Sequence, residues 1–217
     1  MKNQIVRFII LVALAISFLV VLSPAYATPI AHLTLQSEPG DYIGQGGTYD
    51  ITYTPDNSDF FFAWIRRTVG PAPGSPAGLE FVLDNGGPDD TFALLFFGTD
   101  QLGIPIQTGF YPDAERADFA SLGHPGLDVA FQHRGSNTLT GAFTIIDVSF
   151  SPDPFASTGL KIETFSATFE QHSEGAVPAL FGTFTYNASP IPEPSTVFLL
   201  GSGLIGLGAL RKKFRKK

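Results

Sequence analysis

The stretch TYDITYT at residues 48–54 alternates aromatic or aliphatic side chains with polar ones. Tyr49, Ile51 and Tyr53 share one parity, and the residues between and beside them are threonine or aspartate. A period of two is typical of an antiparallel strand that has one face on the core and the other in water. The stretch therefore predicts a half-buried β-strand.

The same signal recurs along the chain. Residues 127–131 and 180–186 also alternate, and both segments predict half-buried strands. The apolar runs FFFAWIRRTV (60–69) and TFALLFF (91–97) predict strands that are buried on both faces. Two further apolar patterns change phase part-way, at residues 143–150 and 160–169, which predicts a β-bulge in each.

These segments predict an all-β fold. Turn clusters rich in Gly, Pro, Asp and Ser separate the strands, and only residues 113–122 could form as much as two or three helical turns. We therefore expect one domain, residues 28–189, that folds as a single jelly-roll-like β-sandwich of about nine or ten strands. The chain has no cysteine, so no disulfide supports this domain.

The N-terminus reads as an export signal. Lys2 and Arg7 precede an apolar run at 8–22, and Ala25 and Ala27 form an A-x-A site. This order predicts a signal peptide, residues 1–27, that is cleaved after Ala27. An uncleaved N-terminal membrane helix is the alternative, and in both cases the chain leaves the cytoplasm.

The C-terminus reads PIPEPSTVFLLGSGLIGLGALRKKFRKK (190–217). A Pro-rich linker (190–196) precedes an apolar segment (197–210), which predicts a transmembrane helix, and a basic tail (211–217) that should stay cytoplasmic. As a helix the apolar segment spans only about 21 Å, whereas the hydrocarbon core of a bilayer is about 30 Å thick. A short, glycine-rich span fits a transient anchor better than a permanent one.

Pro192, Glu193 and Pro194, followed by this apolar helix and basic tail, resemble the PEP-CTERM sorting signal. The resemblance implies recognition by exosortase, a membrane-embedded transpeptidase, and cleavage near the Pro-Glu-Pro triplet. It further implies release to the surface of a Gram-negative cell or beyond it, where such proteins usually accompany exopolysaccharide and biofilm. It does not imply what the central domain does.

The charge of the central domain restricts its partners. Between residues 28 and 194 there are five basic and 20 acidic residues, a formal charge of −15. Such a surface repels nucleic acid and anionic lipid, so we exclude both as partners. Before processing, the chain would meet the membrane only through residues 197–210.

The sequence contains no catalytic motif of the common hydrolase or nucleotide-binding types, so no catalytic residues and no cofactor are predicted. Calcium is the stronger metal candidate. Asp84, Asn85, Asp89 and Asp90 place hard oxygen ligands in a glycine-containing loop, as calcium sites do. The same residue types also make ordinary turns, which is the alternative interpretation.

Few aromatic residues are of the types suited to stacking on sugars. Phe dominates the aromatic content, with 21 residues, and Phe mostly fills cores. Tyr42, Trp64 and Tyr111 are the only sugar-platform candidates, and we expect Trp64 to lie in the core because three Phe residues and an Ala precede it.

A second resemblance covers most of the central domain and includes the segments RGSN (134–137) and QHSEG (171–175). They are similar to RGCN and QHCEG in a recurrent domain of secreted bacterial proteins. Both cysteines of that pattern are serine here, and their paired loss implies that they form a disulfide in the family. Ser136 and Ser173 should then be neighbours, with Cα atoms about 4.4–6.8 Å apart.

Two classes of function remain open. The first is a non-catalytic cell-surface or extracellular matrix protein associated with exopolysaccharide, and we favour it because no catalytic signature is present. The second is a secreted enzyme that acts on polysaccharide. A third possibility, an uncleaved type I membrane protein, differs only in processing.

Overall fold

The computed structural model describes residues 28–71, 74–87 and 89–187, which form ten β-strands and two short 3-10 helices. The strands are β1 (Ala31–Ser37), β2 (Thr48–Tyr53), β3 (Phe60–Val69), β4 (Ser75–Asp84), β5 (Ala93–Gly98), β6 (Gly109–Arg116), β7 (Gly126–Phe131), β8 (Leu139–Pro152), β9 (Leu160–Ser173) and β10 (Ala179–Tyr186). The 3-10 helices are η1 (Asp100–Leu102) and η2 (Ala117–Phe119).

The predicted signal peptide, with Ala25 and Ala27, lies outside the described residues, as do the linker, the apolar segment and the basic tail. Within the part of the chain that is described, no helix is both long and apolar enough to span a membrane.

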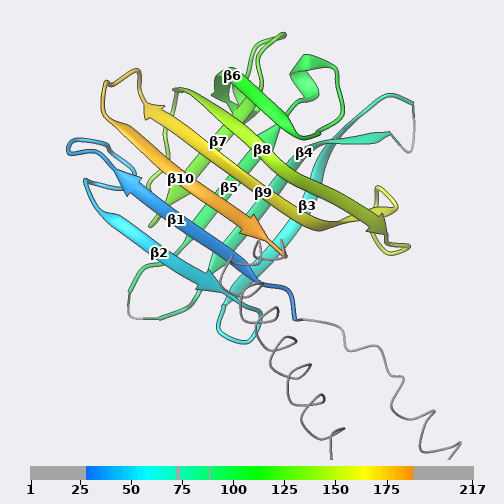
Figure 1. Ribbon diagram of the computed structural model, residues 1–217, viewed down its shortest axis with the longest axis horizontal. Coiled ribbons are helices and arrows are strands. Elements are labelled where there is room, and N and C mark those ends of the chain that lie inside the picture. The colour runs from blue at the N-terminus through cyan, green and yellow to red at the C-terminus, as the bar shows by residue number, and fades with distance from the viewer. Residues whose placement is uncertain (1–27, 72–73, 88, 188–217) are drawn as a thin grey trace, which may run out of the picture.

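All ten strands belong to one sheet, in the order β2-β1-β10-β9-β8-β6-β7-β5-β4-β3. The sheet folds over on itself, so that β8, β9, β10, β1 and β2 lie side by side in front of β7, β5, β4 and β3 (Figure 1). Strand β6 joins the two layers, because it pairs antiparallel with β8 and parallel with β7. Every other pairing in the sheet is antiparallel.

The all-β prediction is confirmed, but the jelly-roll connectivity is wrong. A jelly roll alternates between two separate sheets, whereas here most consecutive strands are hydrogen-bonded neighbours, as in β3-β4-β5 and β8-β9-β10. The difference has a physical reason. Alternation of side chains reports which face of a strand is buried, but it carries no information on which strand pairs with which.

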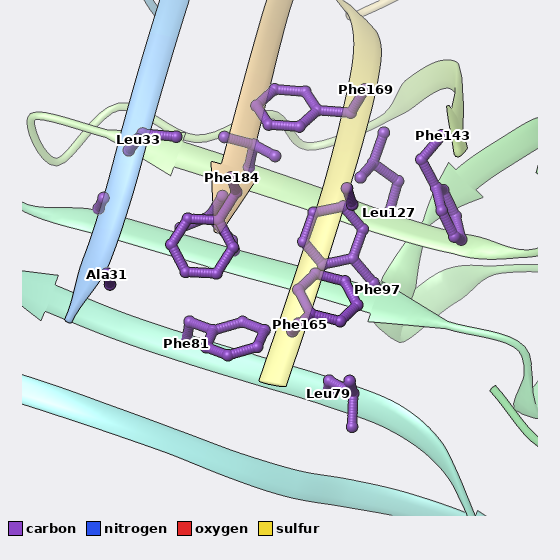
Figure 2. Close-up of a cluster of buried hydrophobic side chains, with 14 of the residues drawn as sticks. Ala31, Leu33, Leu79, Phe81, Phe97, Leu127, Phe143, Phe165, Phe169 and Phe184 are labelled. Atoms are coloured by element: carbon purple, nitrogen blue, oxygen red, sulfur yellow. The ribbon is translucent and has the colours of Figure 1, made fainter. Parts of the chain in front are cut away.

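Phenylalanine and leucine together make up most of the core between the layers (Figure 2). Phe81 on β4 packs against Phe165 on β9 and Phe184 on β10, at ring-centroid distances of 5.2 and 4.7 Å. Phe97 on β5 likewise contacts Phe143 on β8, at 5.4 Å. Rings from the back layer thus interlock with rings from the front layer, which holds the folded sheet closed.

Both predicted bulges are present in the β8–β9 hairpin. The register shifts between Ile145 and Asp147, which leaves Ile146 as the extra residue on β8. It shifts again between Ser149 and Phe150, opposite Thr164 and Ile162, so that Glu163 is the extra residue on β9. These bulges restore the apolar faces to the core after each change of phase.

Strand β3 departs from the prediction. Strand β5 is buried on both faces, as expected, but β3 alternates between exposed and half-buried residues. Trp64, expected in the core, is 42% exposed. The reason is position, because β3 is the last strand of the sheet and pairs only with β4. The region expected to be helical continues β6 to Arg116 and then forms only η2.

The two ends of the described domain are tied together. The backbone N–H of Ile30 donates to the side-chain oxygen of Asn187 at 2.9 Å, and the N–H of Asn187 donates to the carbonyl of Ile30 at 2.8 Å. The chain therefore enters and leaves the domain at one place, close to the predicted boundaries.

Candidate functional site

The structure brings Ser136 and Ser173 together. The hydroxyl of Ser136, in the β7–β8 loop, donates to the hydroxyl of Ser173, at the end of β9, at 2.8 Å. Both side chains are buried. The RGSN and QHSEG segments thus meet through the two positions at which the resemblance placed cysteine.

Glu174 fastens the same loop from outside. Its carboxylate accepts hydrogen bonds from the backbone N–H groups of Asn137 and Thr138, and from the Thr138 hydroxyl. The bond from the Asn137 N–H is the main reason why the pKa of Glu174 lies below its ordinary value. Glu174 therefore acts as an anchor for the loop.

Gln171 is a structural residue whose role the sequence analysis missed. Its side chain is fully buried, and its amide both donates to the Val129 carbonyl and accepts from the Val129 N–H, each at 2.9 Å. Val129 needs this partner because β6 pairs with β7 only at Gly126 and Leu127. A signal existed in the sequence, since Gln171 continues the core-facing row of Ala167 and Phe169.

The calcium prediction is not supported. The side chains of the described residues contain no group of three or more acidic or histidine ligands that could hold a metal ion. Asp84 accepts hydrogen bonds from Gly86 and Thr91 of its own loop, and Asp90 accepts one from Phe92.

The amide group of Asn85 likewise serves the loop: it donates to the carbonyl of Thr52 and accepts from Ser58, while Asp89 is exposed. These residues hydrogen-bond within or beside their own turns, and the calcium assignment stays a prediction.

An open groove of about 550 Å³ crosses the outer face of the front layer. It is lined by residues of six strands that are consecutive in the sheet: β2, β1, β10, β9, β8 and β6. The first five of these lie side by side in the front layer of Figure 1. Threonine hydroxyls line the centre of the groove, Phe110 lies at the β6 end of them, and Phe181 lies beside them on β10.

One transverse row of side chains runs along this groove. Its members are directly opposite one another in the strand pairing, in the order Asp50, Thr34, Thr183, Thr168, Thr144 and Phe110. Because neighbouring strands are about 4.8 Å apart, the row extends about 24 Å. Four adjacent threonines thus present a continuous line of hydroxyl groups that can donate and accept hydrogen bonds.

Two exposed aromatic rings lie next to the hydroxyl row. Phe110 is 65% exposed and Phe181, one row further along β10, is 38% exposed. The sequence analysis missed both. Phe181 had a detectable signal, since it stands in the polar phase of its strand beside Thr183.

The three sugar-platform candidates, Tyr42, Trp64 and Tyr111, do not line the groove. Tyr42 is exposed elsewhere and Trp64 lies on β3 in the back layer. Tyr111 is buried against Phe143, with ring centroids 4.9 Å apart.

Two carboxylates lie in the groove, and each has a histidine partner. Asp50 is 2.6 Å from His32, and Glu170 is 2.9 Å from His172. Strands β2 and β9 are separated by β1 and β10, so the Asp50 and Glu170 backbones are about 14 Å apart. Paired glycosidase carboxylates are about 5–9.5 Å apart, so these two are not spaced as a catalytic pair.

The surroundings of His172 shift its pKa. Partial burial lowers its pKa, but hydrogen bonds with Glu170 and with the Val177 carbonyl outweigh that effect. The pKa of His172 therefore lies above its ordinary value, and its hydrogen bond holds Glu170 at the edge of the groove.

Comparison with known proteins identifies the C-terminal segment. A family model described as a PEP-CTERM protein-sorting motif matches residues 190–213. The chain carries a PEP-CTERM sorting motif. The matched segment includes Pro192, Glu193 and Pro194, which lie outside the described residues. No curated protein and no solved structure matches the chain.

The PEP-CTERM motif implies processing by exosortase, with export and sorting to the cell envelope or the extracellular space. The resemblance of the central domain to the RGCN and QHCEG pattern stays a prediction.

Proposed function

We propose that this PEP-CTERM protein is a non-catalytic cell-surface or extracellular matrix protein that binds exopolysaccharide in the groove of its front layer. The observation that carries the proposal is the row of four threonine hydroxyls between Asp50 and Phe110. An extended groove with many neutral hydrogen-bonding groups suits a linear polymer of hydroxylated rings, and the exposed faces of Phe110 and Phe181 suit the apolar faces of sugars.

The charge of the domain narrows the class of polysaccharide. The surface is strongly acidic, and the only charged side chains lining the groove are Asp50 and Glu170. Polymers rich in uronic acid would be repelled. The favoured ligand is therefore a neutral polysaccharide or one that bears free amines.

The wide spacing of Asp50 and Glu170 supports binding without hydrolysis. The alternative, an enzyme that cuts polysaccharide, would require a carboxylate pair across the bound chain. The two functions are distinguished by incubating the exported protein with its host's exopolysaccharide and measuring new reducing ends. Release that is abolished by Glu170→Gln would replace the binding proposal with the enzymatic one.

The binding test uses the exported protein and purified host exopolysaccharide in a co-sedimentation assay. A triple variant, Thr34→Val, Thr168→Val and Thr183→Val, keeps the shape and the β-branching of the row but removes three of its four threonine hydroxyls. Since a hydrogen bond contributes about 0.5–1.5 kcal/mol, affinity should fall about tenfold or more. Thr185→Val is the matched control, because Thr185 lies on β10, as Thr183 does, but outside the groove. Equal affinity of the triple variant and the wild type would overturn the proposal.

Processing is tested by the intact mass of the protein from its host, with and without exosortase. A C-terminus near 192–194 that depends on exosortase is the expected result. A mass that retains residues 211–217 in both strains would make the protein an uncleaved type I membrane protein.

A further inference from the structure

The outer face of β3 carries an exposed aromatic ladder, which we define as Phe60, Phe62 and Trp64. These side chains are 47%, 42% and 42% exposed. Phe62 and Trp64 stack at a centroid distance of 5.0 Å, and Phe60 lies 6.3 Å from Phe62. The ladder belongs to the back layer, on the opposite side of the molecule from the groove (Figure 1).

Strand β3 also has an open backbone edge. It is the terminal strand of the sheet, and its only strand partner among the described residues is β4. A free edge presents a row of N–H and C=O groups that another β-strand can satisfy. Natural edge strands are usually short, or carry lysine or proline. This one has ten residues, and its first six contain neither a charge nor a proline.

The aromatic ladder is not shaped as a sugar platform. The Phe62 and Trp64 rings are nearly parallel, 12° apart, so each covers one face of the other. A sugar ring needs an uncovered aromatic face. A row of stacked aromatics beside an open strand edge instead matches the combination that β-strand addition uses.

We propose that the partner of this edge is β3 of a second copy of the chain, paired antiparallel about a two-fold axis. A two-fold contact requires that one surface be complementary to itself. Strand β3 meets this requirement when Ala63 lies on the axis. Phe62 then faces Trp64 of the other copy, and Phe61 faces Ile65.

Other registers fit less well. A shift that changes the parity of the pairing would set core-facing residues against outward-facing ones. With Phe62 on the axis, the carboxylate of Asp59 would face the apolar Ile65. With Ala63 on the axis, a small side chain stands where the two backbones approach most closely. The paired segment ends before the bulge in β3 that follows Ile65.

Charge favours the same arrangement. The acidic domain repels a second copy over most of its surface, but β3 contains two of its five basic residues, Arg66 and Arg67. The opposite end of the strand adjoins Asp59 and Asp84. Antiparallel pairing therefore brings the basic end of one strand to the acidic end of the other. Arg66 binds Glu80 through one nitrogen and keeps a half-exposed side chain for this contact.

The primary test is the mass of the exported protein in solution over a range of concentrations, measured by sedimentation velocity. The wild type should approach twice the monomer mass as concentration rises, and Phe62→Lys should remain monomeric. Phe155→Lys is the matched control, because Phe155 is 96% exposed but lies outside β3, and it should dimerise as the wild type does. A wild type that stays monomeric throughout, or a dimer that Phe62→Lys does not affect, would overturn the proposal and leave the ladder to a different partner.

A second measurement covers the case in which Phe62→Lys fails to fold. The chain has no cysteine, so Ala63→Cys introduces a single thiol. Directly opposed residues of antiparallel strands have Cβ atoms about 4.5–5.5 Å apart, so mild oxidation should yield a covalent dimer. Phe155→Cys is the control, because its exposed thiol outside β3 measures only the cross-linking that arises from random collisions. Equal yields from the two variants would refute the two-fold pairing, and this result is independent of whether polysaccharide binds.

Discussion

At the scale of single residues, the Gln171 side chain makes the hydrogen bonds to Val129 that a neighbouring strand would otherwise make. Its amide pairs with both backbone groups of Val129 at the place where β6 turns away from β7. Replacement by leucine would preserve volume but leave a buried N–H and a buried C=O without partners. Each such group costs about 1–3 kcal/mol, so Gln171→Leu should lower the free energy of unfolding by about 2–6 kcal/mol. Urea denaturation measures this loss, and Gln36→Leu, at an exposed site on β1, should change the free energy far less.

Ser136 and Ser173 offer a direct test of what their neighbourhood implies. The 2.8 Å contact between their hydroxyls leaves little movement for a disulfide to form. The double variant Ser136→Cys and Ser173→Cys should oxidise spontaneously on export and raise the free energy of unfolding by about 2–4 kcal/mol over its reduced form. Mass spectrometry and denaturation with and without reductant check both points. Two free thiols in the folded, oxidised sample would contradict the expectation.

His172 gives the protein a pH-dependent contribution to stability. Its pKa is raised in the folded state, because the hydrogen bonds with Glu170 and Val177 outweigh partial burial. A raised pKa stabilises the fold fully below the unfolded value of about 6.5, and the effect is lost as pH rises through the folded pKa. His172→Gln should therefore be less stable than the wild type at pH 5, with a gap that narrows toward pH 8. A gap that does not vary with pH in urea titrations would rule this out.

At the scale of elements, Gly182 on β10 leaves the space that the ring of Phe169 on β9 occupies. A Cβ added at Gly182 would lie 2.2 Å from the ring of Phe169, the residue paired with it. Because Phe169 is itself in the core, Gly182→Ala should force a rearrangement that costs about 1–3 kcal/mol. Gly135→Ala, where the nearest atom would be 3.5 Å away, is the control. Similar thermal midpoints for both variants would show that the ring moves freely.

The elements that sequence could predict are those whose alternation is local. The pattern of Tyr49, Ile51 and Tyr53 specifies β2, and the phase change at Ile146 specifies its bulge, since both depend only on neighbours along the chain. The prediction for β3 was wrong because the aromatic content of a strand does not show whether that strand is central or terminal in its sheet. Position in a sheet is a property of all the strands together.

The groove shows the same limit of sequence-based prediction more clearly. Thr34 on β1 is far in sequence from Thr168 and Thr183, which stand on the consecutive strands β9 and β10, and only the register makes the three a row. Each threonine alone reads as an ordinary polar-face residue. The meeting of Ser136 and Ser173 was accessible from sequence only because the resemblance linked the two positions.

At the scale of the whole molecule, the two proposed surfaces lie on opposite layers. The groove occupies the front layer, and the aromatic ladder of β3 belongs to the back layer (Figure 1). A β3-to-β3 dimer would therefore keep both grooves open. A protein with two separated binding sites links polymer chains, and linkage gains strength from multivalency without any new contact.

This arrangement predicts that binding and cross-linking can be separated. The exported wild type should raise the low-shear viscosity of host exopolysaccharide at concentrations at which it dimerises. Phe62→Lys should bind the polymer with unchanged affinity but leave its viscosity near that of the polymer alone, because one groove cannot join two chains. The triple threonine variant should dimerise normally and also fail to raise the viscosity, because it holds no chain. If Phe62→Lys thickens the polymer as the wild type does, cross-linking does not pass through β3, and the groove would act as a monomeric binding site.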